Sequence, residues 1–408
     1  MCARLLTLLL LVLCVPSICE GQQRVEFTSD LKTFADLSAL KTVLKDVDVV
    51  ALGENTHGLG EVFRAKAQLV EFLHRELGFD LVLFESGFGD AALAWTDRDS
   101  LSSDELTRSF TSNFYYHCEE IRDLVEYVTS TNGTLRIGGI DCQPQQDYFS
   151  RRLTKLIEPV DPVFAKSVVS GLRDFNKLYQ LERDEQTDAF RKQRDQFIAF
   201  LSACEDRLEK LKGREVGDAP SEAEVAGCVE TIRLFKTTYA RVEPGQLMGW
   251  PASVNLRDKA MFERVLDFRK RFPDSKIIIW AQNSHVENQA KPGYSVTWMG
   301  HHLKRHFGEK YYSIGAVVYR GESLGYSDTL EFEHNDEEYL AFHLHRLKRS
   351  SFVLDLRARQ TRVGKTAALG METGGNTAKF VPQDRFDGLL FLEYSGVPKR
   401  LGRATTPE

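Results

Sequence analysis

The sequence predicts an α/β fold in which helices cover a mainly parallel sheet, with one helical insertion. Seven short segments are almost continuously apolar, which is typical of strands buried on both faces. Helical patterns separate most of these segments, as they do where helices connect parallel strands. One stretch, at about residues 150–245, breaks the alternation because it contains helical patterns but no convincing strand.

The apolar segments are rich in β-branched and aromatic residues and are short enough to be strands rather than helices. The predicted strands are residues 48–53, 79–85, 135–141, 276–282, 311–319, 351–356 and 387–394. Helices are predicted between them, for instance at residues 61–77, 119–129 and 253–272. This order favours a single sheet covered by helices.

The stretch at about residues 150–245 consists of charged helical segments. Its apolar side chains recur at steps of three and four residues, the spacing of one helix face. They include Phe190, Phe197, Ile198, Leu201, Leu208 and Leu211. We therefore expect helices that pack on the sheet, within one domain of residues 22–408, rather than an independently folding unit.

Residues 1–21 have the features of a secretory signal peptide. A single Arg precedes an apolar run, and small residues follow it, but the run is too short to span a membrane. We expect an exported protein, secreted or periplasmic, without a membrane-spanning segment after cleavage. Lipidation at Cys14 or Cys19 is less favoured, because a bulky residue precedes each of them.

The charge of the chain argues against nucleic acid as a partner. The formal net charge is −6 and the pI is about 6.0, and Lys and Arg are scattered rather than clustered. A small molecule is the expected partner.

Four cysteines remain after residues 1–21, an even number that suggests disulfides in an oxidising compartment. Cys204 and Cys228 lie on predicted helices on either side of a polar linker. They would face each other in an antiparallel hairpin, so we expect a disulfide between them. Cys118 with Cys142 is the other pairing, and buried free thiols are the alternative for both pairs.

Acidic and imidazole side chains follow four of the predicted strands. Glu54 and His57 follow the first strand, Glu85 ends the second, Asp141 ends the third and His285 follows the fourth. Ligands bind at the carboxyl ends of strands in a parallel sheet, so these side chains are expected to converge. Carboxylates beside imidazoles shift the pKa of both groups, which is how an acid–base pair is tuned. The sequence therefore predicts a functional site at this edge.

The sequence lacks the common catalytic signatures. There is no G-x-S-x-G elbow, Walker loop or H-E-x-x-H motif, and "GFGDAALAW" is not a dinucleotide fingerprint. Without a Ser or Cys nucleophile, the simplest chemistry is attack by water, assisted by a His or carboxylate base. Several aromatic residues near the same edge are candidates for holding an apolar substrate: Trp95, Phe114, Tyr115, Tyr116 and Trp298.

These residues resemble the erythromycin esterase family. The segment "GENTHGLGEVFRAKAQLVEFLHRELGFDLVLFES" is similar to the family's G-E-x-T-H-G block and the helix and strand after it. "IIIWAQNSHV" is similar to its W-A-H-N-x-H segment, and "IGGIDCQ", "NLRDKAMFERVLDF", "MGHHL" and "YYSIG" extend the resemblance over about residues 45–320.

The resemblance implies a hydrolase that opens a macrolide-like lactone or another carboxylic ester without a cofactor, as in antibiotic resistance. It implies that His57 is the general base, that Glu54 and Glu85 orient imidazoles and water, and that His285 lines the same pocket. Substrate contacts are expected from Asp141, Gln143, Asn283 and Trp298.

Two positions depart from the family pattern. Lys66 stands where the family usually has Arg; it keeps the charge for stabilising an oxyanion but lacks the planar fork. Gln282 replaces a common His. These departures put the macrolide substrate in doubt more than the hydrolytic site.

Two other functions remain open. Glu54, His57, Glu85 and His285 are also a plausible ligand set for zinc or manganese in a metal-dependent hydrolase or peptidase. Alternatively, an exported binding protein would hold haem, metal or a lipid-like ligand in this cleft without turnover. The metal content of the purified protein distinguishes a metal-dependent hydrolase from a metal-free esterase. Turnover of a substrate distinguishes either enzyme from a binding protein.

Overall fold

The structure is a computed structural model of the chain. It describes residues 24–26, 37–111, 113–143, 146–183, 187–211, 221–289, 295–325, 327–357, 368–371 and 377–402, and the predicted signal peptide lies outside these ranges. Its strands are β1 (Arg24–Glu26), β2 (Val49–Leu52), β3 (Phe79–Gly87), β4 (Arg136–Asp141), β5 (Lys276–Trp280), β6 (Tyr311–Leu324), β7 (Thr329–Glu333), β8 (Ser351–Asp355), β9 (Ala368–Met371), β10 (Thr377–Phe380) and β11 (Gly388–Ser395).

Nine of the described strands form one mixed sheet. Its order is β1-β8-β11-β6-β2-β5-β3-β4, with β7 also paired to β6, while β9 and β10 form a separate hairpin. The pairs from β11 to β4 are all parallel, whereas β1, β7 and β8 run antiparallel to their neighbours. The seven predicted strands and the mainly parallel sheet are confirmed.

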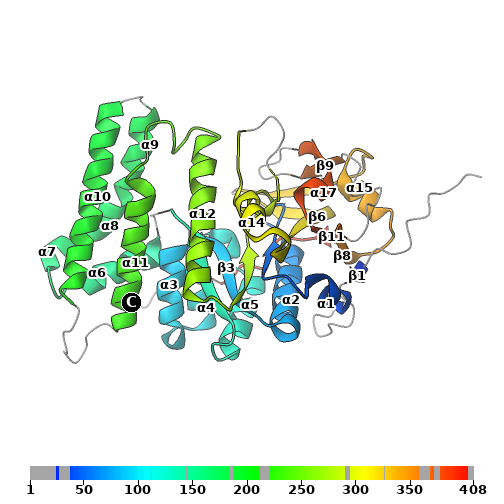
Figure 1. The fold of residues 1–408 in the computed structure, drawn as a ribbon, viewed down its shortest axis with the longest axis horizontal. Coiled ribbons are helices and arrows are strands. Elements are labelled where there is room, and N and C mark those ends of the chain that lie inside the picture. Colours follow the sequence, from blue (N-terminus) through cyan, green and yellow to red (C-terminus); the bar gives the residue numbers. More distant parts are fainter. Residues whose placement is uncertain are drawn as a thin grey trace, which may run out of the picture.

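Helices cover both faces of the sheet (Figure 1). Val50 and Leu52 of β2 belong to one hydrophobic core, whereas Val49 and Ala51 belong to another, because successive residues of a strand point to opposite faces. The first core includes helices α1 (Ala39–Leu44), α2 (Gly60–Leu77), α4 (Ser103–Phe110) and α5 (Glu119–Ser130). The second includes α12 (Ala252–Arg271), α13 (Asn283–Val286), α14 (Met299–Phe307) and α15 (Leu340–His345).

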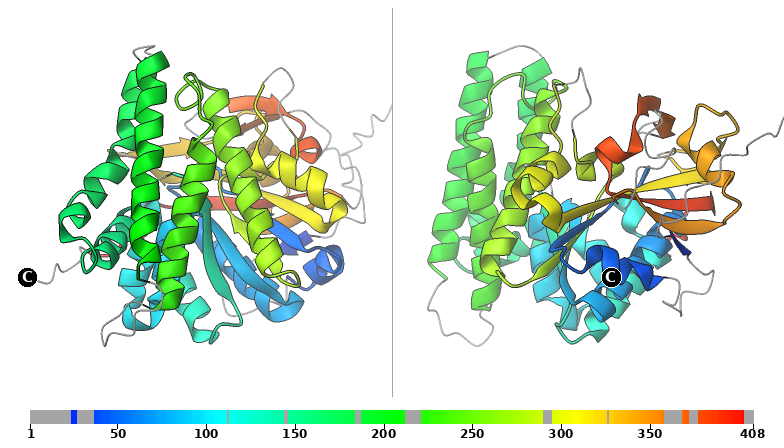
Figure 2. Two further views of the ribbon diagram at one scale, coloured as in Figure 1. Left: turned by 60° about the vertical axis from the view of Figure 1, so that its left-hand side comes forward. Right: turned by 45° about the vertical axis from the view of Figure 1, so that its right-hand side comes forward.

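A helical bundle with its own hydrophobic core lies at the β4 end of the sheet. Its helices are α6 (Asp147–Ile157), α7 (Pro162–Ala165), α8 (Val168–Arg173), α9 (Phe175–Arg183), α10 (Thr187–Glu209) and α11 (Glu222–Tyr239). Phe88 and Leu93 of α3 (Phe88–Thr96) join this core and connect it to the sheet. Figure 2 shows the bundle beside α12, opposite the C-terminal strands and the short helix α17 (Pro382–Arg385).

The expected disulfides are wrong, because Cys118, Cys142, Cys204 and Cys228 are all free and buried. Cys204 and Cys228 do lie on the neighbouring helices α10 and α11, but as thiols within the apolar core of the bundle. Burial raises the pKa of Cys204 to about 12. Cys118 and Cys142 belong to different hydrophobic cores.

In the part of the chain that the structure describes, no helix combines the length and apolar character needed to cross a bilayer.

Candidate active site

The predicted polar residues meet at one edge of the sheet. Strands β2, β5, β3 and β4 are consecutive and parallel, so their carboxyl ends lie side by side. Glu54 and His57 follow β2, Glu85 lies near the end of β3, Asp141 ends β4, and His285 lies on α13, just after β5. All but His57 are buried.

The first part of this edge, which we call the His57 site, is built on Glu54. The Oε1 atom of Glu54 lies 2.6 Å from His57 Nδ1 and accepts a hydrogen bond of 2.8 Å from the Tyr116 hydroxyl. An ionised carboxylate can only accept, so Nδ1 carries a proton and donates it to Glu54, and Nε2 is the ring nitrogen that Glu54 does not bind. The side chain of His57 is 18% exposed, which leaves it within reach of water.

Lys66 completes the His57 site from the buried side of Glu54. Its Nζ donates to Glu54 Oε2 at 2.6 Å and lies 4.1 Å from the centroid of the Trp280 ring. Burial alone would raise the pKa of Glu54, but the charge of Lys66 and the hydrogen bonds from His57 and Lys66 outweigh it and hold that pKa below its ordinary value. Burial lowers the pKa of Lys66 to about 8, against the pull of Glu54. Glu54 is therefore a charged orienting group.

The expected role of Lys66 in stabilising an oxyanion is wrong. Its side chain is fully buried, and its ammonium group is bonded to Glu54, with the carbonyl oxygen of Ala281 at 3.4 Å. A substrate outside the core cannot reach it. Lys66 instead balances the charge of Glu54.

The second part, which we call the His285 site, is built on an imidazole between two carboxylates. Nδ1 of His285 lies 2.8 Å from Asp258 Oδ1, and Nε2 lies 3.2 Å from Glu85 Oε1. Arg257 adds a cation: its Nη2 donates to Glu85 at 2.8 Å and to Asp141 at 2.7 Å. Every carboxylate at this edge thus has a cationic partner.

The protonation of His285 follows from these neighbours. Arg257 Nη1 also lies 3.2 Å from Nε2, and it could donate there only if Nε2 carried no proton. Burial alone would lower the pKa of His285, but Asp258 and Glu85 outweigh burial and raise it to about 10. We therefore assign the imidazolium form, in which Nε2 donates to Glu85.

The two sites are close enough to influence each other electrically. Burial would raise the pKa of Glu85, but the charges of His285 and Arg257 outweigh it and hold that pKa well below its ordinary value. Glu85 therefore stays ionised, and its charge also raises the pKa of Lys66, against burial, in the His57 site.

A cavity of about 250 Å³ opens onto the His285 site. It lies between the end of β4, the helical bundle and α12, and its lining residues are Cys142, Gln143, Tyr179, Tyr239, Gln246, Leu247, Ser253, Val254, Leu256, Arg257, Asp258 and His285. Its polar end consists of Arg257, Asp258 and His285, so a ligand in this cavity would contact the cluster directly.

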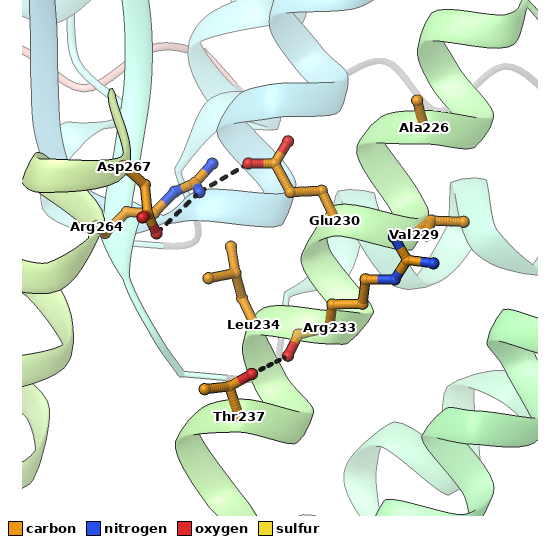
Figure 3. A pocket seen from close by; sticks show the side chains of 8 residues that line it. All are labelled: Ala226, Val229, Glu230, Arg233, Leu234, Thr237, Arg264 and Asp267. Carbon is orange, nitrogen blue, oxygen red and sulfur yellow. Dashed lines mark hydrogen bonds and ion pairs between the residues drawn. The ribbon is translucent and has the colours of Figure 1, made fainter. Parts of the chain in front are cut away.

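A larger hollow of about 310 Å³ lies elsewhere, between α11 and α12 (Figure 3). Its charged groups already pair with each other: Arg264 lies 2.8 Å from Glu230 and 3.8 Å from Asp267. No imidazole lines it. The smaller cavity is therefore the one that lies beside the polar cluster, because Arg257, Asp258 and His285 line it.

The predicted substrate contacts have different outcomes. Trp298 lies edge-on to His285 with ring centroids 5.5 Å apart, and Gln143 lines the cavity. Asp141 binds Arg257. The amide of Asn283 accepts from the nitrogen of Ala316 and donates to its oxygen, both at 2.9 Å, and its expected substrate contact stays a prediction. Asn283 thus connects α13 to β6 by two hydrogen bonds.

The predicted aromatic residues also separate into two groups. The rings of Tyr115 and Tyr116 lie 5.8 Å and 5.6 Å from the His57 ring, and Phe114 packs on Tyr115. Trp95 instead packs against the hydrophobic core. The hydroxyl of Tyr116 donates a hydrogen bond to Glu54, so Tyr116 belongs to the polar cluster rather than to an apolar wall.

Arg257 and Asp258 are the residues that sequence reasoning missed. Both lie on α12, far in sequence from the strand ends. Asp258 did leave a signal, because Asp258, Met261 and Val265 are spaced by three and four residues on the buried face of one helix. A carboxylate within a buried apolar stripe needs a partner, and that partner is His285.

The expected metal alternative finds little support in the donor geometry. Within the described ranges, no group of three or more His, Cys, Asp or Glu side chains is placed to hold a metal ion. Glu54 and Glu85 already bind Lys66 and Arg257, so a divalent cation would have to displace one of them.

Comparison with known proteins identifies similar chains. The family model for erythromycin esterase matches residues 74–395. YbfO of Bacillus subtilis (strain 168), whose name describes it as a proposed hydrolase, is 30% identical over 72% of this chain and 70% of its own. Erythromycin esterase type II of Escherichia coli is 26% identical over 71% of this chain and 73% of its own.

Solved structures share the fold. A succinoglycan biosynthesis protein superposes with a TM-score of 0.71 at 19% identity, covering 93% of this chain and 96% of its own. A mutant of the erythromycin esterase EreC in its open conformation gives a TM-score of 0.64 at 16% identity, over 92% and 98% of the two chains.

Proposed function

Because this chain belongs to the erythromycin esterase family, we propose that it is a carboxylic ester hydrolase that uses His57 to activate water. Its family and its relatives support a hydrolase; the ester bond and the roles of the residues are our proposal. The observation that carries it is the bond between His57 Nδ1 and the buried Glu54, which leaves Nε2 as a base on the accessible side of the ring.

In the first step, His57 takes a proton from water while the water oxygen attacks the ester carbonyl carbon. Glu54 holds the ring in the required tautomer and stabilises the imidazolium that forms. Negative charge develops on the carbonyl oxygen. Arg257 and His285 are the cationic donors that line the cavity, and we assign them to that oxygen.

In the second step, the tetrahedral intermediate collapses and the bond between carbonyl carbon and alkoxy oxygen breaks. His57 returns its proton to the leaving alkoxide. The products are a carboxylic acid and an alcohol, or one hydroxy acid from a lactone, and no covalent enzyme intermediate or cofactor is needed.

The test is mass spectrometry of macrolides, simple lactones and short-chain esters after incubation with the purified protein, with and without a chelator. We expect a product heavier by one water from a lactone, or an acid and an alcohol from an acyclic ester, formed equally in both conditions. Loss of product with the chelator and recovery with a divalent ion would establish the metal-dependent alternative. Absence of hydrolysis of every ester would contradict the proposed function and favour a binding protein.

We also propose that the protein is exported by its N-terminal segment. The support is the pattern of residues 1–21, which lie outside the described residues. N-terminal sequencing of protein expressed from the full gene should find a chain that begins at Glu20 or Gln22. A chain that retains Met1 in the exporting host would contradict this proposal.

A further inference from the structure

Three polar atoms form a triangle on the buried side of the His57 site. The Tyr116 hydroxyl lies 2.8 Å from Glu54 Oε1 and 3.4 Å from His57 Nδ1, and these two atoms lie 2.6 Å apart. Burial and the charges of Glu54 and Glu85 raise the pKa of Tyr116 well above its ordinary value, so the hydroxyl keeps its proton. An ionised carboxylate can only accept, so the hydroxyl donates to Glu54. Tyr116 therefore stabilises the carboxylate that binds the proposed base.

Tyr116 is out of reach of a substrate. The residue is 0% exposed, and its ring packs against Phe63 and Phe84, with centroids 5.4 Å and 6.3 Å away. Any influence of Tyr116 on the reaction must therefore pass through Glu54 and His57. This makes it a candidate positioning residue.

The last described residues of the chain hold the segment that carries Tyr116. Residues 396–402, which we call the C-terminal strap, follow β11 and contact the start of α5. The oxygen of Lys399 accepts from the nitrogen of Glu119 at 2.7 Å, and the nitrogen of Lys399 donates to Glu120 Oε2 at 3.1 Å. The strap is thus bonded to the helix that begins just after Tyr116.

The C-terminal strap also contacts the segment that follows His57. Helix α2 begins at Gly60, whose nitrogen donates to the oxygen of Gly396 at 2.8 Å. The nitrogen of Gly396 donates in turn to Glu61 Oε2 at 2.5 Å. The strap therefore connects the segment after His57 to the segment after Tyr116, and it fixes the two relative to each other.

Two carboxylates anchor the C-terminal strap, and one guanidinium joins them. Arg64 donates through Nη1 to Glu61 and through Nη2 to Glu120, both at 3.3 Å. Glu120 is buried, whereas Arg64 and Glu61 are partly exposed. Removing the carboxylate of Glu120 would loosen the strap without removing any contact of Glu54 or His57.

We propose that Tyr116 is a positioning residue for the proposed base, and that the C-terminal strap holds Tyr116 in place. The hydroxyl of Tyr116 keeps Glu54 oriented toward His57, and the strap keeps that hydroxyl within bonding distance of Glu54. This inference rests on the proposed function, because it assigns both elements to the general base. A spectroscopic readout tests the positioning separately from turnover.

The experiment compares Tyr116→Phe, Glu120→Ala and the double variant with the wild type. Tyr116→Phe removes only the hydroxyl, and Glu120→Ala removes one anchor of the C-terminal strap. Tyr127→Phe is the matched control for the first, because its hydroxyl lies 2.7 Å from Nδ1 of another imidazole, that of His74. Glu119→Ala is the control for the second, because Glu119 contacts the strap through its backbone nitrogen.

Two quantities are measured: the kinetic constants on an accepted ester, and the NMR resonance of the His57 Nδ1 proton, identified by its loss in His57→Gln. We expect Tyr116→Phe to lower kcat about tenfold with KM unchanged, because a hydrogen bond to a charged group is lost but no substrate contact is. Glu120→Ala should lower kcat about threefold, and the double variant about tenfold rather than about thirtyfold, because both changes act through Tyr116. The Nδ1 proton should exchange faster with water in all three variants than in the wild type and the two controls.

An unchanged kcat and an unchanged Nδ1 resonance in Tyr116→Phe would overturn the proposal, as would losses of kcat that multiply in the double variant. Melting temperatures identify a variant that fails to fold. Leu401→Ala, which shortens a buried side chain of the C-terminal strap, then takes the place of Glu120→Ala. If the wild type hydrolyses no ester but the resonance responds as expected, the proposed function fails and the positioning by Tyr116 and the strap stands.

Discussion

His57 and His285 both follow parallel strands, and each bonds a carboxylate through Nδ1, at 2.6 Å and 2.8 Å. They differ in what else surrounds them. His57 has one carboxylate and is 18% exposed, whereas His285 lies between two carboxylates and is 5% exposed. The same pair of residue types therefore has two different environments, and we propose the base role for His57 and a fixed cation for His285.

The difference comes from the second oxygen of each carboxylate. Glu54 accepts from Lys66 through Oε2 while its Oε1 faces His57, so a buried cation balances its charge beside the imidazole. Asp258 Oδ2 is buried and has no hydrogen-bond partner among the described residues. The charge of Asp258 is balanced by His285 and by the nearby guanidinium of Arg257. The cationic partner of Glu54 is thus a buried lysine, whereas Asp258 relies on an imidazole and an arginine.

The largest expected effect is on kcat, and chemical rescue by added imidazole distinguishes His57 from His285. His57→Ala should lower kcat on an accepted ester by about 10²–10⁴-fold, the usual contribution of a general base. Added imidazole should restore part of that loss, because His57 is accessible to solvent, but should not rescue the buried His285→Ala. Initial rates with and without imidazole measure both effects. Equal rescue of both variants would remove the distinction between the sites.

A smaller effect concerns Lys66, whose pKa is lowered to about 8 by burial. Above pH 8, wild-type Lys66 loses its proton, so Glu54, which orients His57, loses its cationic partner and activity should fall. Lys66→Arg stays charged, so its activity should persist about one pH unit higher.

The measurement for Lys66 is the pH–rate profile of kcat/KM between pH 6 and about 10, with Lys66→Met as the variant that loses the charge at every pH. An unchanged alkaline limb in Lys66→Arg would show that Lys66 does not set it. Loss of folding in that variant would appear in its melting temperature and must be checked first.

The smallest effect is on the stability of the fold. The direction in which stability changes with pH follows from the raised pKa of His285. The pKa of His285 is raised from 6.5 to about 10 in the folded state, mainly by Asp258 and Glu85 against the effect of burial. The stabilisation by this imidazolium is therefore complete below about pH 6.5 and is lost as the pH rises through about 10. The difference in melting temperature between the wild type and His285→Asn should shrink over that range. A constant difference would contradict the imidazolium assignment.

The sequence was a good guide to the strands and their ends because both depend on local patterns. Continuous apolar runs identified the parallel strands, and Glu54, Glu85, Asp141 and His285 could be placed together from strand order alone. Asn283 shows the limit of this reasoning. It lies at the same edge, but its amide is used by Ala316 on β6, a contact that the position of Asn283 in the sequence does not reveal.

The cysteines show the same limit for pairing. Cys204 and Cys228 do lie on neighbouring helices, as their symmetric positions suggested, yet they remain free thiols in the core of the bundle. Spacing along the chain predicts which helices meet. It does not predict the side-chain geometry that a disulfide requires.

The sequence by itself determined the α/β class, the edge of the sheet that carries the site, and the acids and imidazoles that meet there. These properties follow from hydrophobic periodicity and from the parallel direction of the strands. Only the tertiary structure showed what surrounds each imidazole and which cation balances each carboxylate. Those surroundings depend on Lys66 of α2, on Arg257 and Asp258 of α12, and on burial, which strengthens the effect of each charge.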